Sequence, residues 1–361
     1  MNKIESLPPP QAHRGPRVLL VGDGVTALSA LRSLAACCDV VGIIRAAAAA
    51  DPVRREAAAK GIEVWGCDHL RDLTEIIKRI QPDAVVISSF SRILPPDLLA
   101  LSLFVNVHYA PLPKCRGRAN VNWAIINGEK TAGLSVHRVA PGLDDGDILF
   151  QQEVEISSTD TAQSVYDRLN AIQQRKLGPA VLRALAGVAG APQDEELATY
   201  GCGRTPDDGE IDWRQPSTAI DRLFRALSPP FPGAFTFHGT RRLTLSRAVP
   251  LNTPPLYAGR VPGRVVGRSR AEGFVDVLTG DGVFRLFDVR TEDGATVRAA
   301  EVIRSTRATL GLSTLVLLRA IETLEQRLAV LEARVNAPSS PAPPDPTTAS
   351  SGRTERSAPA S

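Results

Sequence analysis

Three side chains suited to acyl transfer lie near one another in this sequence. Asn106 and His108 stand two positions apart, and Asp144 follows 36 residues after His108. An amide N–H can stabilise a developing oxyanion, and an imidazole can take and return a proton near neutral pH. A carboxylate can orient that imidazole and raise its pKa. The set predicts transfer of an acyl unit to an amine without a metal or a covalent intermediate.

The surrounding residues indicate how these groups are positioned. Residues 104–108 read as a strand, and its alternation puts Asn106 and His108 on one face at the carboxyl end. A proline-stiffened loop covers 109–118, a helix covers 120–127, and Gly128 ends it. A further strand at 133–137 leads into the loop 141–146, which can return Asp144 to His108.

The first half of the chain alternates strands with helices. Apolar runs at 17–22, 40–44, 62–65 and 83–87 read as strands, and helical patterns at 26–36, 51–61 and 68–80 separate them. An N-cap at Asp51 followed by Pro52 predicts the start of the second of these helices. This order predicts an α/β fold with a Rossmann-like, doubly wound parallel sheet.

The first strand–helix turn carries Gly22-x-Gly24-x-x-Ala27. A dinucleotide site would require an acidic residue about 20 positions further on, at the end of the second strand. That strand instead ends at Arg45, and alanines follow. We therefore interpret the glycines as allowing a tight turn.

The pattern changes beyond a boundary expected at 190–205. Residues 217–227 predict a short helix, and short strands follow at 233–238, 241–247, 261–267, 273–278 and 282–289. This spacing predicts a small, OB-like β-barrel domain followed by a C-terminal helix.

The C-terminal helix carries a heptad pattern. Apolar residues recur at alternating intervals of four and three, at positions 317, 321, 324, 328, 331 and 335. β-branched residues at a and leucines at d favour a parallel two-stranded coiled coil, and hence a homodimer. Packing of the helix on its own barrel is the alternative.

Composition restricts the classes of partner. The net charge of +3 and the lack of long basic runs argue against a nucleic acid. No apolar run reaches the roughly 18 residues of a membrane span. Five cysteines, an odd number without metal-type spacing, indicate reduced thiols in a cytoplasmic protein. No metal site is expected, because the carboxylates of Asp145 and Asp147 more often cap turns or stay solvated.

Longer motifs resemble one enzyme family. Residues 106–118 (NVHYAPLPKCRGR), 122–129 (NWAIINGE) and 133–139 (GLSVHRV) are similar to 10-formyltetrahydrofolate-dependent formyltransferases. The similarity extends over about 17–305 and includes residues 203–209 and 225–235. It implies an N-formyltransferase whose formyl donor is 10-formyltetrahydrofolate, with a formyltransferase fold.

The resemblance also assigns residues. The catalytic asparagine, histidine and aspartate of the family fall on Asn106, His108 and Asp144. The folate contacts of the family fall on Arg92, Ile93, Leu94, Arg118, Ala140, Pro141, Gly142, Leu143 and Asp144. One departure is Ala110-Pro-Leu-Pro113, where the family usually has Ser-Leu-Leu-Pro, so the loop loses a hydroxyl and gains rigidity.

The sequence does not identify the acceptor amine. Residues 116–129 look closest to the enzymes that formylate aminoarabinose, which favours a small-molecule amino sugar, in some cases nucleotide-linked. Hydroxyornithine or another amine of natural-product assembly is an alternative. Methionyl-tRNA is disfavoured, because that branch has a long basic loop where this chain has five alanines after Arg45. A non-catalytic scaffold would not need the three polar residues.

These observations give the expected organisation of the chain. Residues 1–16 form a disordered N-terminus, 17–198 the catalytic domain and 199–308 the C-terminal barrel. Residues 309–337 form the heptad helix, whose 317–335 seam would mediate dimerisation, and 338–361 a disordered tail rich in Pro, Ser, Ala and Thr.

Overall fold

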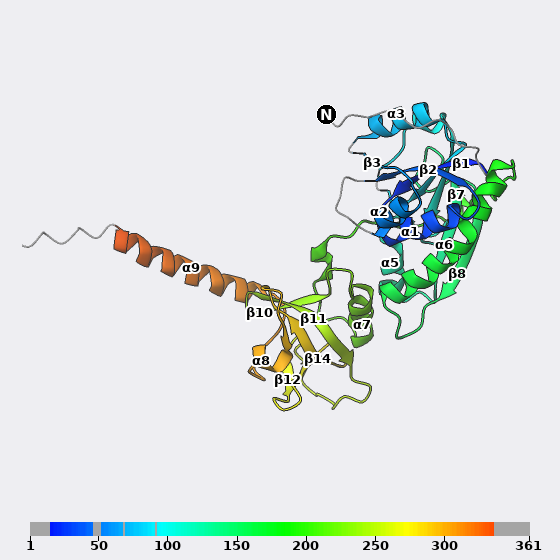
Figure 1. Cartoon of the computed structure of the whole chain (residues 1–361). Helices are drawn as coiled ribbons and strands as arrows, with labels where there is room; N and C mark the ends of the chain where they lie inside the picture. The colour runs from blue at the N-terminus through cyan, green and yellow to red at the C-terminus, as the bar shows by residue number, and fades with distance from the viewer. Residues whose placement is uncertain (1–14, 46–51, 68, 91, 336–361) are drawn as a thin grey trace, which may run out of the picture. The chain divides into compact units, whose positions relative to one another are not determined.

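A computed structural model describes residues 15–45, 52–67, 69–90 and 92–335 of the chain (Figure 1). The predictions made for 1–14, Asp51, Asp68 and 338–361 lie outside these residues. The chain divides into two compact units, one ending at Gly311 and one beginning at Leu312. Each unit is described by itself.

The first unit contains a seven-stranded sheet. Five parallel strands occur in the order β3 (Val64–Gly66), β2 (Asp39–Arg45), β1 (Arg17–Gly22), β4 (Ala84–Ser88) and β5 (Leu103–His108). They confirm the predicted Rossmann-like parallel sheet.

The sheet continues beyond β5 with β7 (Thr131–Arg138) and then β8 (Ile148–Glu155). β7 is antiparallel to both of its neighbours, so the complete sheet is mixed. For β7 and β8 the reason is the short connection 139–147, because parallel neighbours need a crossover of about a dozen residues or more.

Helices cover both faces of this sheet (Figure 1). The face that includes Val18 and Leu20 packs against α1 (Gly24–Leu34), α2 (Pro52–Ala59), α5 (Asn120–Asn127) and α6 (Ala162–Leu185). The face that includes Leu19 and Val21 packs against α3 (Leu70–Ile80) and α4 (Pro96–Leu99). The alternation along β1 therefore produces two cores, one on each side. No pattern in the sequence analysis predicted α6.

The turn after β1 shows why glycine is needed there. A Cβ on Gly22 would lie 1.7 Å from the carbonyl oxygen of Ser88, and its φ is +156°. The fold therefore requires close approach of two backbones at the carboxyl ends of β1 and β4. Arg45, which stands where a dinucleotide site would need an acid, is buried and pairs with Asp23 at 3.1 Å.

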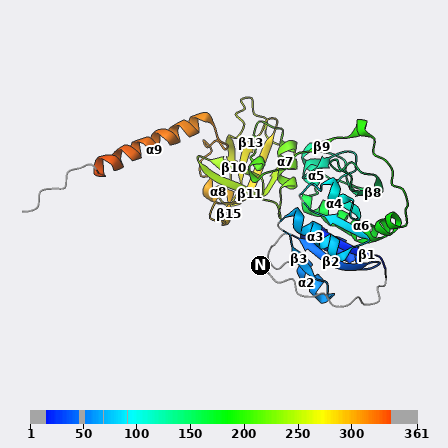
Figure 2. The ribbon, with the colours of Figure 1, turned by 90° about the horizontal axis from the view of Figure 1, so that it is seen from above.

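A third core is built on an antiparallel sheet (Figure 2). The strands β10 (Phe235–His238), β11 (Arg241–Pro250), β14 (Val283–Arg290), β13 (Val275–Leu278) and β12 (Val265–Arg268) follow in this order, and β15 (Thr296–Arg298) pairs with β14. α7 (Ser217–Ala226) and α8 (Ala299–Val302) complete this region. The predicted barrel is thus a half-barrel.

Residues 187–203, between the parallel sheet and the antiparallel sheet in the sequence, form a strap that contacts the loops 109–118 and 139–147. It contains β9 (Tyr200–Gly201), which pairs in parallel with the two-residue strand β6 (Arg116–Gly117). An isolated bridge joins Ala191 to Ile148 at the start of β8. The strap therefore connects the loop that follows His108 with the hairpin that carries Asp144.

The described part of the second unit, residues 312–335, contains the helix α9 (Thr314–Val335). The six side chains of the heptad seam are between 45 and 82% exposed. Among the helices of the described residues, none is long and apolar enough to cross a membrane.

Candidate active site

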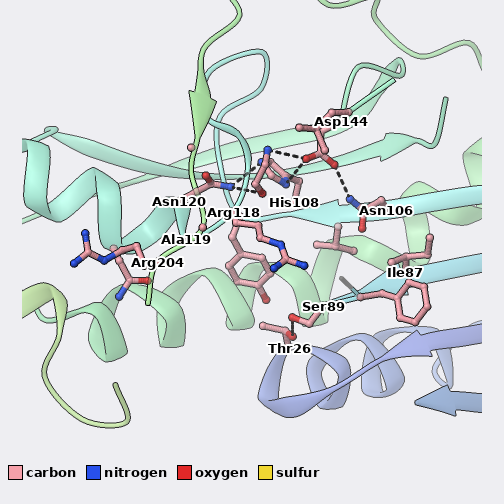
Figure 3. Close-up of a pocket in the computed structure, with 18 of the residues that line it drawn as sticks. Thr26, Ile87, Ser89, Asn106, His108, Arg118, Ala119, Asn120, Asp144 and Arg204 are labelled. Carbon is pink, nitrogen blue, oxygen red and sulfur yellow. Dashed lines mark hydrogen bonds and ion pairs between the residues drawn. The ribbon is translucent and has the colours of Figure 1, made fainter. Parts of the chain in front are cut away.

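The structure brings Asn106, His108 and Asp144 together at the end of β5 (Figure 3). Oδ2 of Asp144 lies 3.4 Å from Nδ1 of His108. Oδ1 of the same carboxylate accepts a 3.2 Å hydrogen bond from Nδ2 of Asn106. Asp144 therefore bridges the two residues of the strand, although 36 residues separate it from His108.

Asp144 reaches this position through a left-handed backbone conformation. Its φ is +51°, which is uncommon for a residue other than glycine. The backbone N–H of Gly117 donates to Oδ2 over 2.9 Å. Gly146 lies so close to the carbonyl of Arg138 that a Cβ would approach it to 2.0 Å. The tight loop thus directs the carboxylate towards His108.

His137 on β7 is a fourth member of the cluster. Its Nδ1 lies 2.8 Å from the carbonyl oxygen of Arg138, which can only accept, so Nδ1 carries a proton. In the tautomer that carries its single proton on Nδ1, Nε2 accepts from Nδ2 of Asn106 over 3.1 Å, and the same atom lies 3.5 Å from Oδ1 of Asp144. The sequence suggested a structural or pocket-lining role for this histidine, and in the structure it fixes the Asn106 amide.

The second nitrogen of His108 has two protein partners. Nε2 lies 2.8 Å from the carbonyl oxygen of Cys115 and 2.9 Å from Nδ2 of Asn120. A carbonyl satisfies an N–H, whereas an amide N–H satisfies a lone pair. The site therefore offers Nε2 a partner in each protonation state, as a group that alternates between base and acid requires.

Burial dominates the electrostatics of the pair. It lowers the pKa of His108, although the Asp144 carboxylate and the Cys115 carbonyl act in the opposite direction and His137 reinforces the decrease. The sequence predicted that Asp144 raises this pKa; it acts in that sense, but burial outweighs it. For Asp144, burial raises the pKa, but His137, His108 and the Gly117 N–H outweigh it, and the pKa is about 2. A neutral imidazole thus faces an ionised carboxylate near pH 7.

The cluster lies in a cleft of about 1250 Å³. The residues that the resemblance assigned to folate line this same cleft, with the exception of Pro141: Arg92, Ile93, Leu94, Arg118, Ala140, Gly142, Leu143 and Asp144. Leu94 is buried, whereas Ile93 is 73% exposed at the rim. Most of the assigned set is therefore contiguous in space.

Sequence reasoning missed some residues of the site. It treated Asn120 as a helix start only, and it gave no role to Gln193, whose amide donates to the carbonyls of Asp144 (2.7 Å) and Gly146 (2.8 Å). No spacing rule links residue 193 to residue 144. For Asn120, the available signal was a polar residue at the start of a helix that faces the catalytic strand.

The loop that departs from the family pattern is held from β7. The hydroxyl of Ser135 donates to the carbonyl of Ala110 over 2.7 Å and accepts from the N–H of Leu112 over 3.2 Å. Pro111 lies against Gly133, where a Cβ would come within 2.6 Å of its nitrogen. A hydroxyl from the neighbouring strand therefore satisfies the backbone of this loop.

All five cysteines have free thiols. In the described residues, no three His, Cys, Asp or Glu side chains gather as a metal ion would require.

Two matches to known families cover most of the chain. Residues 37–182 match the family described as "Formyl transferase", and residues 204–307 match "Formyl transferase, C-terminal domain". A methionyl-tRNA formyltransferase of Caldanaerobacter subterraneus subsp. tengcongensis is 32% identical over 247 residues, which cover 67% of this chain and 78% of the relative.

Solved structures share the fold at low identity. HypX from Aquifex aeolicus, in complex with tetrahydrofolic acid, has a TM-score of 0.55 at 18% identity. The match covers 81% of this chain, which spans about half (47%) of the HypX chain. WlaRD, a sugar 3N-formyl transferase solved with dTDP and 5-N-formyl-THF, has a TM-score of 0.56 at 16% identity, over 79% of this chain and 100% of its own.

Enzymes of the matched family transfer a formyl group from 10-formyltetrahydrofolate to an amine. The three residues that the resemblance assigned to catalysis line one cleft, and the two family matches follow each other along the chain. This chain belongs to the formyl transferase family and is an N-formyltransferase.

Proposed function

We propose that the protein transfers the formyl group of 10-formyltetrahydrofolate to a primary amine of a small molecule, and that this molecule is an amino sugar, in some cases nucleotide-linked. The observation that carries the proposal is the convergence of Asn106, His108 and Asp144 in one cleft. The folate contacts remain a proposal as well: Arg92, Ile93 and Leu94 on one wall, Arg118 on another, and the loop 140–144.

The chemistry follows from the positions of the three groups. The amine attacks the formyl carbon, and negative charge develops on the formyl oxygen. In the structure both hydrogens of the Asn106 amide have partners, His137 and Asp144. One of these bonds must be exchanged for the formyl oxygen as charge develops there, and a donor of this kind is worth roughly 10²–10³ in rate.

His108 accepts the proton of the amine and later donates it. Its lowered pKa keeps the ring neutral near pH 7, so it can accept the proton that the attacking amine loses. The Asp144 carboxylate, ionised because its pKa is about 2, stabilises the resulting imidazolium. The ring then returns the proton to the departing folate nitrogen.

The cleft suits two ligands at once. Pockets for one drug-sized ligand measure about 300–1000 Å³, and this cleft of about 1250 Å³ is larger. Its lining includes hydroxyl groups, for example Thr26 and Ser89, whose oxygens lie 2.7 Å apart. Such groups can hydrogen-bond the hydroxyls of a sugar, which supports a polar acceptor beside the folate.

Two observations weigh against tRNA as the acceptor. Only residues 46–51 separate β2 from α2, which leaves little chain for a basic loop. Arg45, at the end of β2, is buried against Asp23 rather than offered to phosphates. Methionyl-tRNA nevertheless stays as the second candidate, because the 32% identical relative is a methionyl-tRNA formyltransferase.

A panel of acceptors tests the assignment. The enzyme is incubated with 10-formyltetrahydrofolate and nucleotide-linked amino sugars, free amino sugars, hydroxyornithine or charged initiator tRNA, and product mass is recorded. A 28 Da gain on an amino sugar supports the proposal. Formylation of methionyl-tRNA alone would replace it by the second candidate, and formylation of hydroxyornithine alone would contradict the amino sugar.

We also propose that α9 joins two copies in a parallel coiled coil. With Ile321 at an a position, Arg327 falls at g and Glu332 at e. In a parallel pair, g of one helix faces the following e of the other, so Arg327 meets Glu332 of the second copy. An antiparallel pair would place like charges opposite each other. The charge pattern therefore favours a parallel homodimer.

A cytoplasmic location is part of the same proposal. All five cysteines have free thiols, which suits a reducing compartment.

A further inference from the structure

Asp144 has an unusual backbone for a catalytic residue, and its strain must be held by something outside its own loop. Left-handed conformations of residues other than glycine persist only where the surroundings impose them. The carbonyl oxygens of Asp144 and Gly146 both accept hydrogen bonds from a side chain outside the loop 139–147. The groups that restrain its backbone come from the strap, residues 187–203.

Gln193 is the contact between the strap and this loop. Its Nε2 donates to the carbonyl oxygens of Asp144 at 2.7 Å and Gly146 at 2.8 Å, so both of its hydrogens are used on the catalytic loop. Two carbonyls held by one planar amide have a fixed separation and direction. Gln193 therefore holds the backbone carbonyl before residues 145–146 and the backbone carbonyl at their end, that is, the carbonyls of Asp144 and Gly146.

Arg116 in turn holds Gln193. Its side chain is only 2% exposed, and both Nε and Nη2 donate to Oε1 of Gln193, at 3.1 and 2.9 Å. Nη1 and Nη2 also pair with the carboxylate of Glu195, at 2.8 and 2.6 Å. The guanidinium thus fixes the orientation of the amide, because Oε1 must face Arg116 and Nε2 must face the carbonyls.

The same arginine belongs to the loop that carries the partners of His108. Cys115, whose carbonyl lies 2.8 Å from Nε2, immediately precedes Arg116, and Gly117, whose N–H bonds Asp144, immediately follows it. His108 is therefore connected to the backbone of Asp144 in four steps. A hydrogen bond leads from His108 to Cys115, the backbone leads on to Arg116, and hydrogen bonds lead from Arg116 to Gln193 and from Gln193 to Asp144.

We propose that Gln193, oriented by Arg116, is a positioning residue that sets the distance between the Asp144 carboxylate and the His108 imidazole. This inference rests on the proposed roles of His108 and Asp144. Without the Gln193 amide, the loop relaxes from its left-handed conformation and the carboxylate moves away from the ring.

The pH dependence separates this role from simple stabilisation. Within the described residues, Asp144 and His137 are the ionisable groups that act on His108, and Asp144 is the one that raises its pKa. If the carboxylate moves away, the pKa of His108 falls further. The limb of the pH profile of kcat that reports the ionisation of His108 then moves to lower pH, which a general loss of stability would not cause.

The test uses the full-length enzyme with Gln193→Met, which keeps the length but removes the hydrogen bonds. Gln193→Glu is the second variant, because it keeps an acceptor for Arg116 but loses the donor. Gln152→Met, on the exposed part of β8, is the matched control. We expect kcat to fall on the order of 10- to 100-fold in both Gln193 variants, as for other small misplacements of reacting groups. The pH profile of kcat of Gln193→Met should also move to lower pH.

Three results would overturn the inference: kcat close to wild type in Gln193→Glu, a uniform decrease of kcat at every pH in Gln193→Met, or an equal loss in Gln152→Met. His108→Ala, assayed in parallel, distinguishes a failure of the proposed mechanism from a failure of the positioning role of Gln193. If that variant keeps full turnover, the proposed mechanism itself is wrong. If it is inactive while both Gln193 variants resemble wild type, only the positioning role is wrong.

Discussion

The side-chain amide of Asn120 lies 2.9 Å from Nε2 of His108, the same nitrogen that lies 2.8 Å from the Cys115 carbonyl. The amide also donates to the carbonyl of Gly117 over 3.3 Å, which directs its hydrogens, rather than its oxygen, towards the ring. Asn120 therefore stabilises the unprotonated nitrogen, and the Cys115 carbonyl stabilises the protonated one. The balance between these two partners helps to set the proton affinity of the base.

Asn120→Leu should shift the pH profile of kcat upwards. The substitution removes the donor that favours the unprotonated Nε2 but leaves the acceptor that favours the protonated form, so the pKa of His108 rises. The measurement is kcat between pH 5 and 9, with circular dichroism to verify folding. A profile that stays at the wild-type position would show that the Asn120 contact has no effect on the ring.

Asp144→Asn should shift the same profile in the opposite direction. The carboxylate raises the pKa of His108, so its loss lowers that pKa and moves the limb that reports His108 to lower pH. Because the imidazolium also loses its counter-ion, kcat should fall by roughly 10²–10⁴. An upward shift, or kcat within about threefold of wild type, would contradict the assigned role of Asp144.

The strand alternation of 104–108 was enough to predict that Asn106 and His108 share a face, and the loop lengths were enough to bring Asp144 near them. Both follow from local rules of period and connection. The contact of Gln193 with the backbone of Asp144, and that of Arg116 with Gln193, could not be predicted in this way. They depend on a strap that returns over the site after α6, and no local pattern encodes that path.

In the sheet, too, the strands with a local sequence pattern were predicted, and the features that depend on pairing between strands were not. The five strands up to β5 each have their own apolar run, and the sequence predicted all of them within a few residues. β8 has exposed residues at 151–153, so it lacks a continuous apolar run and was missed. The antiparallel direction of β7 depends on its pairing with β5, which sequence periodicity does not specify.

Truncation after Ser313 should leave the kcat of formyl transfer within about twofold of the full-length value, because the cleft lies in the first unit. It should also change the mass in solution from that of a dimer to that of a monomer, as measured by sedimentation velocity. Arg327→Glu should weaken the dimer, and Arg327→Glu with Glu332→Arg should restore it. An unchanged mass after truncation would favour a helix that packs on its own chain.

Gly22→Ala should destabilise the fold. The added Cβ would meet the Ser88 carbonyl at 1.7 Å, so β1 and β4 must separate at their carboxyl ends. Overpacking of this kind costs roughly 1–3 kcal/mol, which urea denaturation can detect. Gly259→Ala is the control, because no atom lies within 4 Å of its Cβ position. Equal stability of the two variants would contradict the close approach.

The most direct test of the central claim is the rate of formyl transfer by His108→Ala in the presence of saturating 10-formyltetrahydrofolate and an accepted amine. Proton transfer by this ring predicts a decrease in kcat of roughly 10²–10⁴, while the Kd of the folate donor, measured separately by calorimetry, stays within a few-fold of wild type. A variant that keeps kcat within tenfold of wild type would contradict the account, because the proton would then have another route out of the amine.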